Sequence, residues 1–127
     1  MIQIDPILLS VYARTFKSIS DEMSISVQKT TRSPILCEAK DFVTGLYDAD
    51  GRMLEQTENL PILAFSLAPV CKYIRGFYGD DIHEGDVIFH NDVFSLGNQN
   101  NDVAVYKPVF FAGELVACGA GLHEDGL

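Results

Sequence analysis

The sequence predicts an α+β domain in which an N-terminal amphipathic helix packs on a mainly antiparallel sheet built from β-hairpins. Three observations indicate this fold: an apolar period of three to four residues near the N-terminus, and two pairs of strand-like runs joined by tight turns. The 127 residues are enough for one domain with one core, which we assign to residues 1–127. The 47% hydrophobic and 21% charged residues exclude a disordered chain.

The first helix is predicted to run from Pro6 to about Thr30. Asp5 is a suitable N-cap, and proline is favoured at the first helical position. Ser33-Pro34 ends the pattern, because the residue before a proline is pushed out of helical conformation. One apolar stripe follows the helix, made of Leu8, Leu9, Tyr12, Phe16, Ile19, Met23 and Val27. We expect this stripe to belong to the core.

The next segment is predicted to be a β-hairpin. The runs Phe42 to Tyr47 and Arg52 to Gln56 are strand-like and flank a turn that ends in Asp50-Gly51. Asp and Gly tolerate the positive φ angles of tight hairpin turns. The turn superficially resembles a calcium-binding loop, but it lacks the downstream ligands and the bidentate glutamate of such a loop.

The second half of the chain is predicted to contain a short helix, a strand and another hairpin. The helix is expected from about Ser66 to Tyr78, with Gly79 as its stop, and the strand from Val87 to Phe89. The arms of the hairpin are Val103 to Phe111 and Glu114 to Cys118. The chain stops soon after a strand with no closing element, so we expect an incomplete domain.

Charge and cysteine content exclude several classes of function. A net charge of −9 would repel phosphates, so we expect neither nucleic acid nor a membrane as a partner. The N-terminus lacks the pattern of a secretory signal, which predicts a cytoplasmic protein. The three cysteines are too widely spaced for a disulfide framework or a zinc site. We expect Cys71 and Cys118 to be buried among apolar residues.

The residues most suited to chemistry surround the stretch GNQNNDV at positions 97–103. The set consists of Asn91, Asp92, Gln99, Asp102 and His123, with His90 nearby. Carboxylates and imidazoles are common ligands of divalent metals. Asp102 lies near the start of the second hairpin and His123 near its end, so we expect the two to be neighbours. The alternative is a polar turn, because Asn and Gly favour left-handed and capping conformations.

A specific resemblance covers nearly the whole chain. Residues 29–56, KTTRSPILCEAKDFVTGLYDADGRMLEQ, resemble the N-terminal signature of the hydantoinase B/oxoprolinase family. Further matching positions follow in the same order: Asp21, Glu22, Met23, Leu60, Pro61, Gly85, Asp86, Val87, Asn91, Asp92, Asp102, Val103, Pro108, Val109, Phe110, Gly113, Glu114, Leu115 and Val116. Family members run to several hundred residues, so the resemblance covers their first part only.

The resemblance implies an activity divided between subunits. The family includes B subunits of ATP-dependent hydantoinases and 5-oxoprolinases, and related subunits of acetone and acetophenone carboxylases. It implies that an A-type partner uses ATP to phosphorylate the substrate oxygen, and that the B-type catalytic subunit then hydrolyses the activated cyclic amide. The implied assembly is a hetero-oligomer. Two alternatives remain open: a subunit of an ATP-dependent ketone carboxylase, and a non-catalytic assembly module when this chain is isolated and inactive.

The resemblance also implies site residues. Asp102, Asp92 and Asn91 are the implied catalytic residues, and a divalent metal (Mn, Mg or Zn) is implied at Asp102, His123 and Gln99. Gln99 departs from the family pattern, because many members carry a histidine at the matching position. An amide oxygen is a weaker ligand than imidazole for a transition metal.

Overall fold

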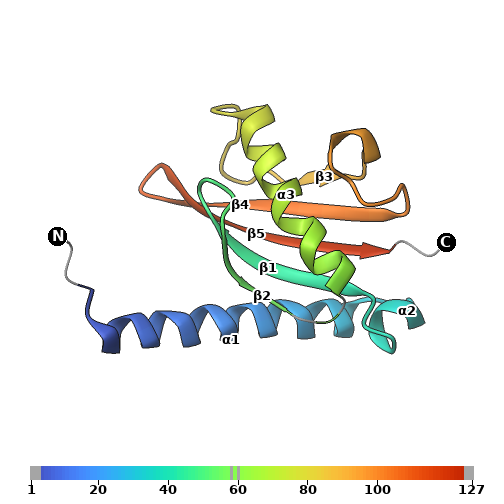
Figure 1. Ribbon diagram of the computed structural model, residues 1–127, viewed down its shortest axis with the longest axis horizontal. Helices are drawn as coiled ribbons and strands as arrows, with labels where there is room; N and C mark the ends of the chain where they lie inside the picture. The colour runs from blue at the N-terminus through green and yellow to red at the C-terminus, as the bar shows by residue number, and fades with distance from the viewer. Residues whose placement is uncertain (1–3, 58, 60, 125–127) are drawn as a thin grey trace.

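The computed structural model describes residues 4–57, 59 and 61–124 and confirms the predicted fold class. Five strands form one antiparallel sheet in the order β2-β1-β5-β4-β3, with α1 and α3 on opposite faces (Figure 1). The helices are α1 (Pro6–Thr30), α2 (Pro34–Cys37) and α3 (Pro61–Tyr78), with a 3-10 turn η1 (Val93–Ser95). The strands are β1 (Phe42–Asp48), β2 (Met53–Gln56), β3 (Ile88–His90), β4 (Asp102–Phe111) and β5 (Glu114–Glu124).

The bounds of α1 match the prediction, but the burial of its apolar stripe does not. Asp5 caps the helix by accepting a hydrogen bond from the Ile7 amide at 2.9 Å. The expectation that the stripe belongs to the core was wrong: Leu8, Leu9, Tyr12 and Ile19 are exposed. An apolar period of three to four residues indicates that one side of a helix is apolar, but it does not indicate what covers that side.

A hydrogen-bonded group of hydroxyls holds α1 against the sheet. Ser20 is the only residue of α1 that is fully buried. The Thr44 hydroxyl on β1 donates to the Ser20 carbonyl at 3.2 Å, and the Thr44 amide donates to the Thr57 hydroxyl at 2.9 Å. The Thr57 amide in turn donates to the Thr44 carbonyl at 2.8 Å. Because these buried polar groups satisfy one another, they fix the position of α1 beside β1 and β2.

The core lies between α3 and the face of the sheet that points away from α1. Its buried side chains are Val43, Tyr47, Leu63, Leu67, Val70, Cys71, Ile74, Ala104, Tyr106, Cys118, Ala120 and Leu122. The predicted burial of Cys71 and Cys118 is confirmed, and all three cysteines are free thiols. A hydrogen bond with Cys118, together with burial, raises the pKa of the Cys71 thiol. Full burial makes both Cys71 and Cys118 small core side chains.

Helix α3 begins earlier than predicted, at Pro61 instead of Ser66. Pro69 lies inside the helix at an exposed position, and a proline there biases a sequence reading toward a later start. The helix was predicted from the spacing of Leu67, Val70, Ile74 and Phe77. The first three are buried together with Leu63, whereas Phe77 is exposed.

Strand β5 is longer than predicted, ending at Glu124 instead of Cys118. The segment Gly119-Ala120-Gly121 carries little strand propensity and was therefore not included. In the structure it forms part of the central strand, paired with both β1 and β4. Backbone hydrogen bonds to β1 and β4 hold this segment in the sheet, although its side chains have low strand propensity. The first hairpin formed as predicted, and β3 lies one residue later than expected.

Two turn glycines with similar φ angles give a matched stability prediction. Gly51 has φ 77° and Gly113 has φ 80°. A Cβ at Gly51 would lie 2.9 Å from the Lys72 backbone nitrogen on α3, whereas nothing lies within 4 Å of a Cβ at Gly113. We expect Gly113→Ala to cost about 1–2 kcal/mol of folding free energy from the left-handed backbone alone. Gly51→Ala should cost about 1–3 kcal/mol more, because the added methyl overpacks the contact with α3.

Urea unfolding of the two glycine variants measures this difference. Equal losses of stability in Gly51→Ala and Gly113→Ala would contradict the close packing of the β1–β2 turn on α3.

Candidate functional site

Asp102 is the carboxylate that the structure buries most completely in the candidate site. It is the first residue of β4 and is 1% exposed. Asn98 donates from Nδ2 to Asp102 Oδ2 at 2.5 Å, and Gln99 donates from Nε2 to Oδ1 at 3.1 Å. The Asp102 amide donates to the Gln99 carbonyl at 3.0 Å. Because a buried carboxylate is costly without donors, these two amides make its charge tolerable inside the domain.

The loop before β4 is folded tightly on itself. The Gly97 amide donates to the Asp92 carbonyl at 2.9 Å, and a Cβ at Gly97 would lie 2.7 Å from that oxygen. Asn91 donates from its side chain to the Asn100 carbonyl at 3.0 Å, which joins the two ends of the loop. Only glycine therefore fits at position 97, and the segment 91–101 is a structured loop instead of a loose connection.

Asp92 and His90 make local contacts within the same loop. Asp92 caps η1: its carboxylate accepts from the Phe94 amide at 3.0 Å and from the Ser95 hydroxyl at 2.7 Å. The Ser95 hydroxyl and then the Phe94 amide lower the pKa of the Asp92 carboxyl. His90 donates from Nε2 to the Ser95 carbonyl at 2.9 Å and packs against the Tyr73 ring. In this chain Asp92, Asn91 and His90 thus hold the loop in shape.

The structure places Asp102 and His123 on opposite faces of the sheet. Asp102 pairs with Glu124, and Val103 pairs with His123. Successive strand residues alternate between faces, so Asp102 projects with Ala104 and Tyr106 toward α3. His123 lies on the opposite face and lines the space between α1 and the sheet. The two backbones are neighbours, as predicted from the hairpin, but the alternation along each strand places the two side chains on opposite faces.

The predicted metal ligands therefore do not form a joint site. Asp102 and His123 are separated by the sheet, and Gln99 directs its amide nitrogen, a donor, at Asp102. A metal ligand must present a lone pair, which this orientation of Gln99 does not. Within residues 4–57, 59 and 61–124, no group of three or more His, Cys, Asp or Glu side chains is placed to hold a metal ion.

The role of Asn98 was not predicted from the sequence. Its side chain makes the shortest hydrogen bond to Asp102, four residues away. The signal was present, since the cluster of amides around one aspartate supplies the donors that a buried carboxylate needs. The pairing of Asp102 with Glu124 was also missed, because β5 was predicted to end before it.

No helix in the described part of the chain is long and apolar enough to cross a membrane.

Comparison with known proteins identifies relatives at both the sequence and the structure level. The family model described as hydantoinase B/oxoprolinase matches residues 5–123. The caprolactamase subunit beta of Pseudomonas jessenii is 41% identical over 126 residues, which is 97% of this chain and 22% of that protein. The 5-oxoprolinase of Dictyostelium discoideum is 31% identical over 125 residues, or 97% of this chain and 10% of the enzyme.

Solved structures share the fold. The crystal structure of ATP-dependent caprolactamase from Pseudomonas jessenii superposes with a TM-score of 0.89 and 38% identity, over 97% of this chain and 21% of that one. A nucleotide-free acetone carboxylase structure gives a TM-score of 0.82 at 23% identity, over 94% of this chain and 16% of that one. The second likeness concerns the fold alone. The chain spans about a fifth of the length of the caprolactamase subunit that it matches.

Proposed function

This chain belongs to the hydantoinase B/oxoprolinase family, and on that basis we propose that it forms part of the B-type catalytic subunit of an ATP-dependent enzyme that hydrolyses a cyclic amide. Relatives at 41% and 31% identity are a caprolactamase subunit and a 5-oxoprolinase, both named for the opening of a lactam ring. The observation that carries the proposal is the buried Asp102, held by two amides at the start of β4.

In this proposal an A-type partner subunit uses ATP to phosphorylate the amide oxygen of the substrate. Phosphorylation makes the carbonyl carbon electrophilic and turns the oxygen into a leaving group. Water then adds to that carbon, and the C–N bond breaks with a proton going to nitrogen, which leaves an acyl phosphate. A second water molecule hydrolyses the acyl phosphate to the carboxylate and inorganic phosphate. The reaction needs a base to take a proton from the attacking water.

We assign the role of this general base to Asp102. Its Oδ2 is held by Asn98 at 2.5 Å, while Oδ1 is held by Gln99 at 3.1 Å. Gln99 is exposed, so its side chain can turn outward and let a water molecule take its place as the donor to Oδ1. Oδ1 is then the oxygen that water reaches, and Asn98 keeps the carboxylate in place. Asp92 and Asn91 support the same site by holding the loop that carries both amides.

The partners and location follow from the same proposal. We infer a hetero-oligomer with an A-type, ATP-using subunit, a small cyclic amide as substrate, and a cytoplasmic location. The runner-up is a ketone carboxylase subunit, which shares this fold. We prefer the assignment as a cyclic-amide hydrolase because the relative at 41% identity is a caprolactamase subunit. The likeness to acetone carboxylase concerns the fold alone.

A family-length chimera tests the assignment. In it, this chain replaces the matching residues of the Pseudomonas jessenii caprolactamase subunit beta, and it is combined with the partner subunit of that enzyme. ATP turnover is then measured with caprolactam, 5-oxoproline, hydantoin, and acetone or acetophenone with bicarbonate. We expect turnover with at least one cyclic amide and none that needs bicarbonate. Turnover with ketones and bicarbonate only would replace the proposal by the carboxylase alternative.

A divalent metal stays a prediction for the whole protein, and no step above depends on one. Metal analysis of the 127-residue chain, after incubation with Mn²⁺, Mg²⁺ or Zn²⁺ and dialysis, tests the proposed ligands. Because Asp102 and His123 lie on opposite faces, we expect Asp102→Ala and the parent chain to retain equal amounts of metal. A stoichiometric metal that is lost in Asp102→Ala would contradict this placement.

A further inference from the structure

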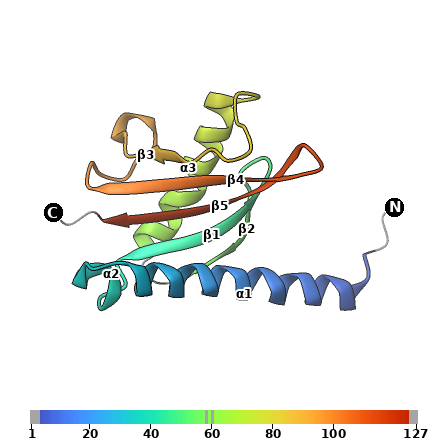
Figure 2. The ribbon, with the colours of Figure 1, turned by 180° about the vertical axis from the view of Figure 1, so that it is seen from behind.

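The face of the sheet opposite α3 is only partly covered. Helix α1 lies along β1 and β2, and the same face of β5 and β4 is open in Figure 2. Between α1 and these strands runs a groove of about 790 Å³, called here the α1 groove. Its apolar walls include Ile19, Met23 and Val27 from α1, Phe42 and Leu46 from β1, and Val105 and Val109 from β4.

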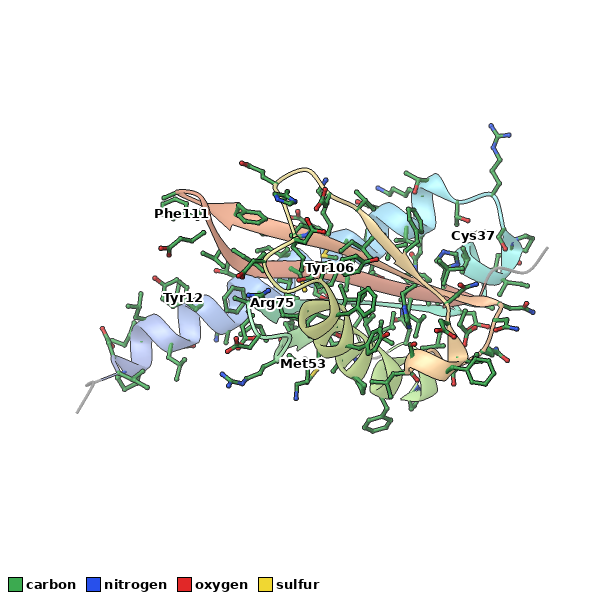
Figure 3. The ribbon with its side chains drawn as sticks, turned by 90° about the horizontal axis from the view of Figure 1, so that it is seen from above. Tyr12, Cys37, Met53, Arg75, Tyr106 and Phe111 are labelled. Atoms are coloured by element: carbon green, nitrogen blue, oxygen red, sulfur yellow. The ribbon has the colours of Figure 1, made fainter. Side chains whose placement is uncertain are left out.

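The apolar stripe of α1 continues this groove beyond the sheet. The N-terminal end of α1 projects past the β1–β2 hairpin in both Figure 1 and Figure 2. Leu8, Leu9 and Tyr12 lie on this projecting half and are about half exposed, at 48%, 56% and 53%. Figure 3 shows Tyr12 on this part of the helix. A contiguous apolar surface of this kind is typical of a surface that another segment covers.

The floor of the α1 groove is bare backbone. Gly119 and Gly121 occupy alternate positions of β5 on this face, and both line the groove. A Cβ at Gly119 would meet only the end of the Met23 side chain, at 3.4 Å, so steric conflict does not require glycine there. The missing side chains leave depth above the central strand, into which a packed element of another segment fits.

His123 adds a polar atom without a partner to the same groove. It follows Gly121 on the same face of β5, and its Nδ1 is buried with no hydrogen-bond partner. A buried polar atom left unpaired is costly, so native proteins normally pair it with protein or water. An occupant of the α1 groove would supply that partner at this end.

We propose that the α1 groove and the stripe of Leu8, Leu9 and Tyr12 dock an apolar segment from the part of a B-type polypeptide that lies outside residues 1–127, with a polar group of that segment meeting His123. The caprolactamase subunit matches this chain over 22% of its length, so most of such a polypeptide is available to cover the surface. The recessed glycine floor suits an inserted element better than the flat, self-complementary contact of a second copy. The proposal rests on family membership and is independent of the chemistry assigned to Asp102.

Cysteine labelling compares the 127-residue chain with the family-length chimera described above. Tyr12→Cys reports on the projecting stripe and Val109→Cys on the sheet side of the groove, both in a Cys37→Ser background, since Cys71 and Cys118 are fully buried. Arg14→Cys is the matched control, because it is exposed and lies on the opposite side of α1 from Tyr12. The probe is a charged maleimide, and the readout is the rate of labelling.

We expect Tyr12→Cys and Val109→Cys to react at least about tenfold more slowly in the chimera, with Arg14→Cys less affected. Equal rates in both proteins would overturn the proposal. Labelling of the 127-residue chain that slows as the protein concentration rises would also overturn it, because it would identify a second copy as the occupant. Protection of the chimera that appears only when the partner subunit is added would overturn it as well, because the partner would then be the occupant. A chimera that does not fold also counts against it, because the docking surface would then not match.

Discussion

Replacing Asp102 by asparagine in the family-length chimera is expected to lower cyclic-amide-dependent ATP turnover by about 10²–10⁴-fold, the usual contribution of a general base. Asparagine has nearly the same shape, so the side chain still fits its buried position at the start of β4. It cannot take a proton from water, and one of its two terminal atoms becomes a donor that faces a donor of Asn98 or Gln99. The loss is therefore chemical more than structural.

The control for Asp102→Asn is Glu114→Gln, which removes an exposed carboxylate at the other end of the same hairpin. We expect it to keep full turnover. Circular dichroism and thermal unfolding check that Asp102→Asn remains folded, with a cost of about 1–3 kcal/mol for the disturbed hydrogen bonds. Turnover near that of the parent chimera in a folded Asp102→Asn protein would end the assignment of Asp102 as the base.

Replacing Leu67 by alanine is expected to destabilise this chain by about 2–5 kcal/mol. Leu67 is fully buried on α3, at the centre of the contact between this helix and the sheet. Truncation removes apolar contacts and leaves a cavity that the surrounding strands fill only partly. Because small domains have about 5–15 kcal/mol of stability, the loss is a large share of the total.

Phe65→Ala on the same helix is the matched control for Leu67→Ala. Phe65 is 81% exposed, so we expect a change within about 0.5 kcal/mol. Urea unfolding of both variants gives the comparison, and Leu67→Met should recover most of the loss because it restores the volume. A Phe65→Ala loss as large as that of Leu67→Ala would contradict the placement of the core under this face of α3.

The elements predictable from the sequence were those with local signals. Asp5-Pro6 and Ser33-Pro34 bracket α1, and the turn ending at Gly51 joins β1 to β2. Such signals depend on the backbone preferences of a few adjacent residues, so they survive any tertiary arrangement. The far end of β5 had no such signal, because its glycines and alanine are held in the sheet by neighbouring strands.

The candidate site was predictable in composition but not in geometry. The amides around Asp102 indicated a structured loop, and the structure shows two of them as donors to the carboxylate. The predicted contact between the Asp102 and His123 side chains was wrong, because a shift of one residue along a strand moves a side chain to the other face of the sheet. The burial of the α1 stripe was not predictable, since an apolar period identifies one side of a helix and does not indicate what covers that side.

The most direct test of the central claim is the product formed by the chimera with its partner subunit. We predict that a ring-opened amino acid and ADP appear in equal amounts from a cyclic amide and ATP, in the absence of bicarbonate, and that the rates of formation of both fall together by about 10²–10⁴-fold in Asp102→Asn. Consumption of ATP without a ring-opened product, or a carboxylated ketone as the only product, would contradict the account.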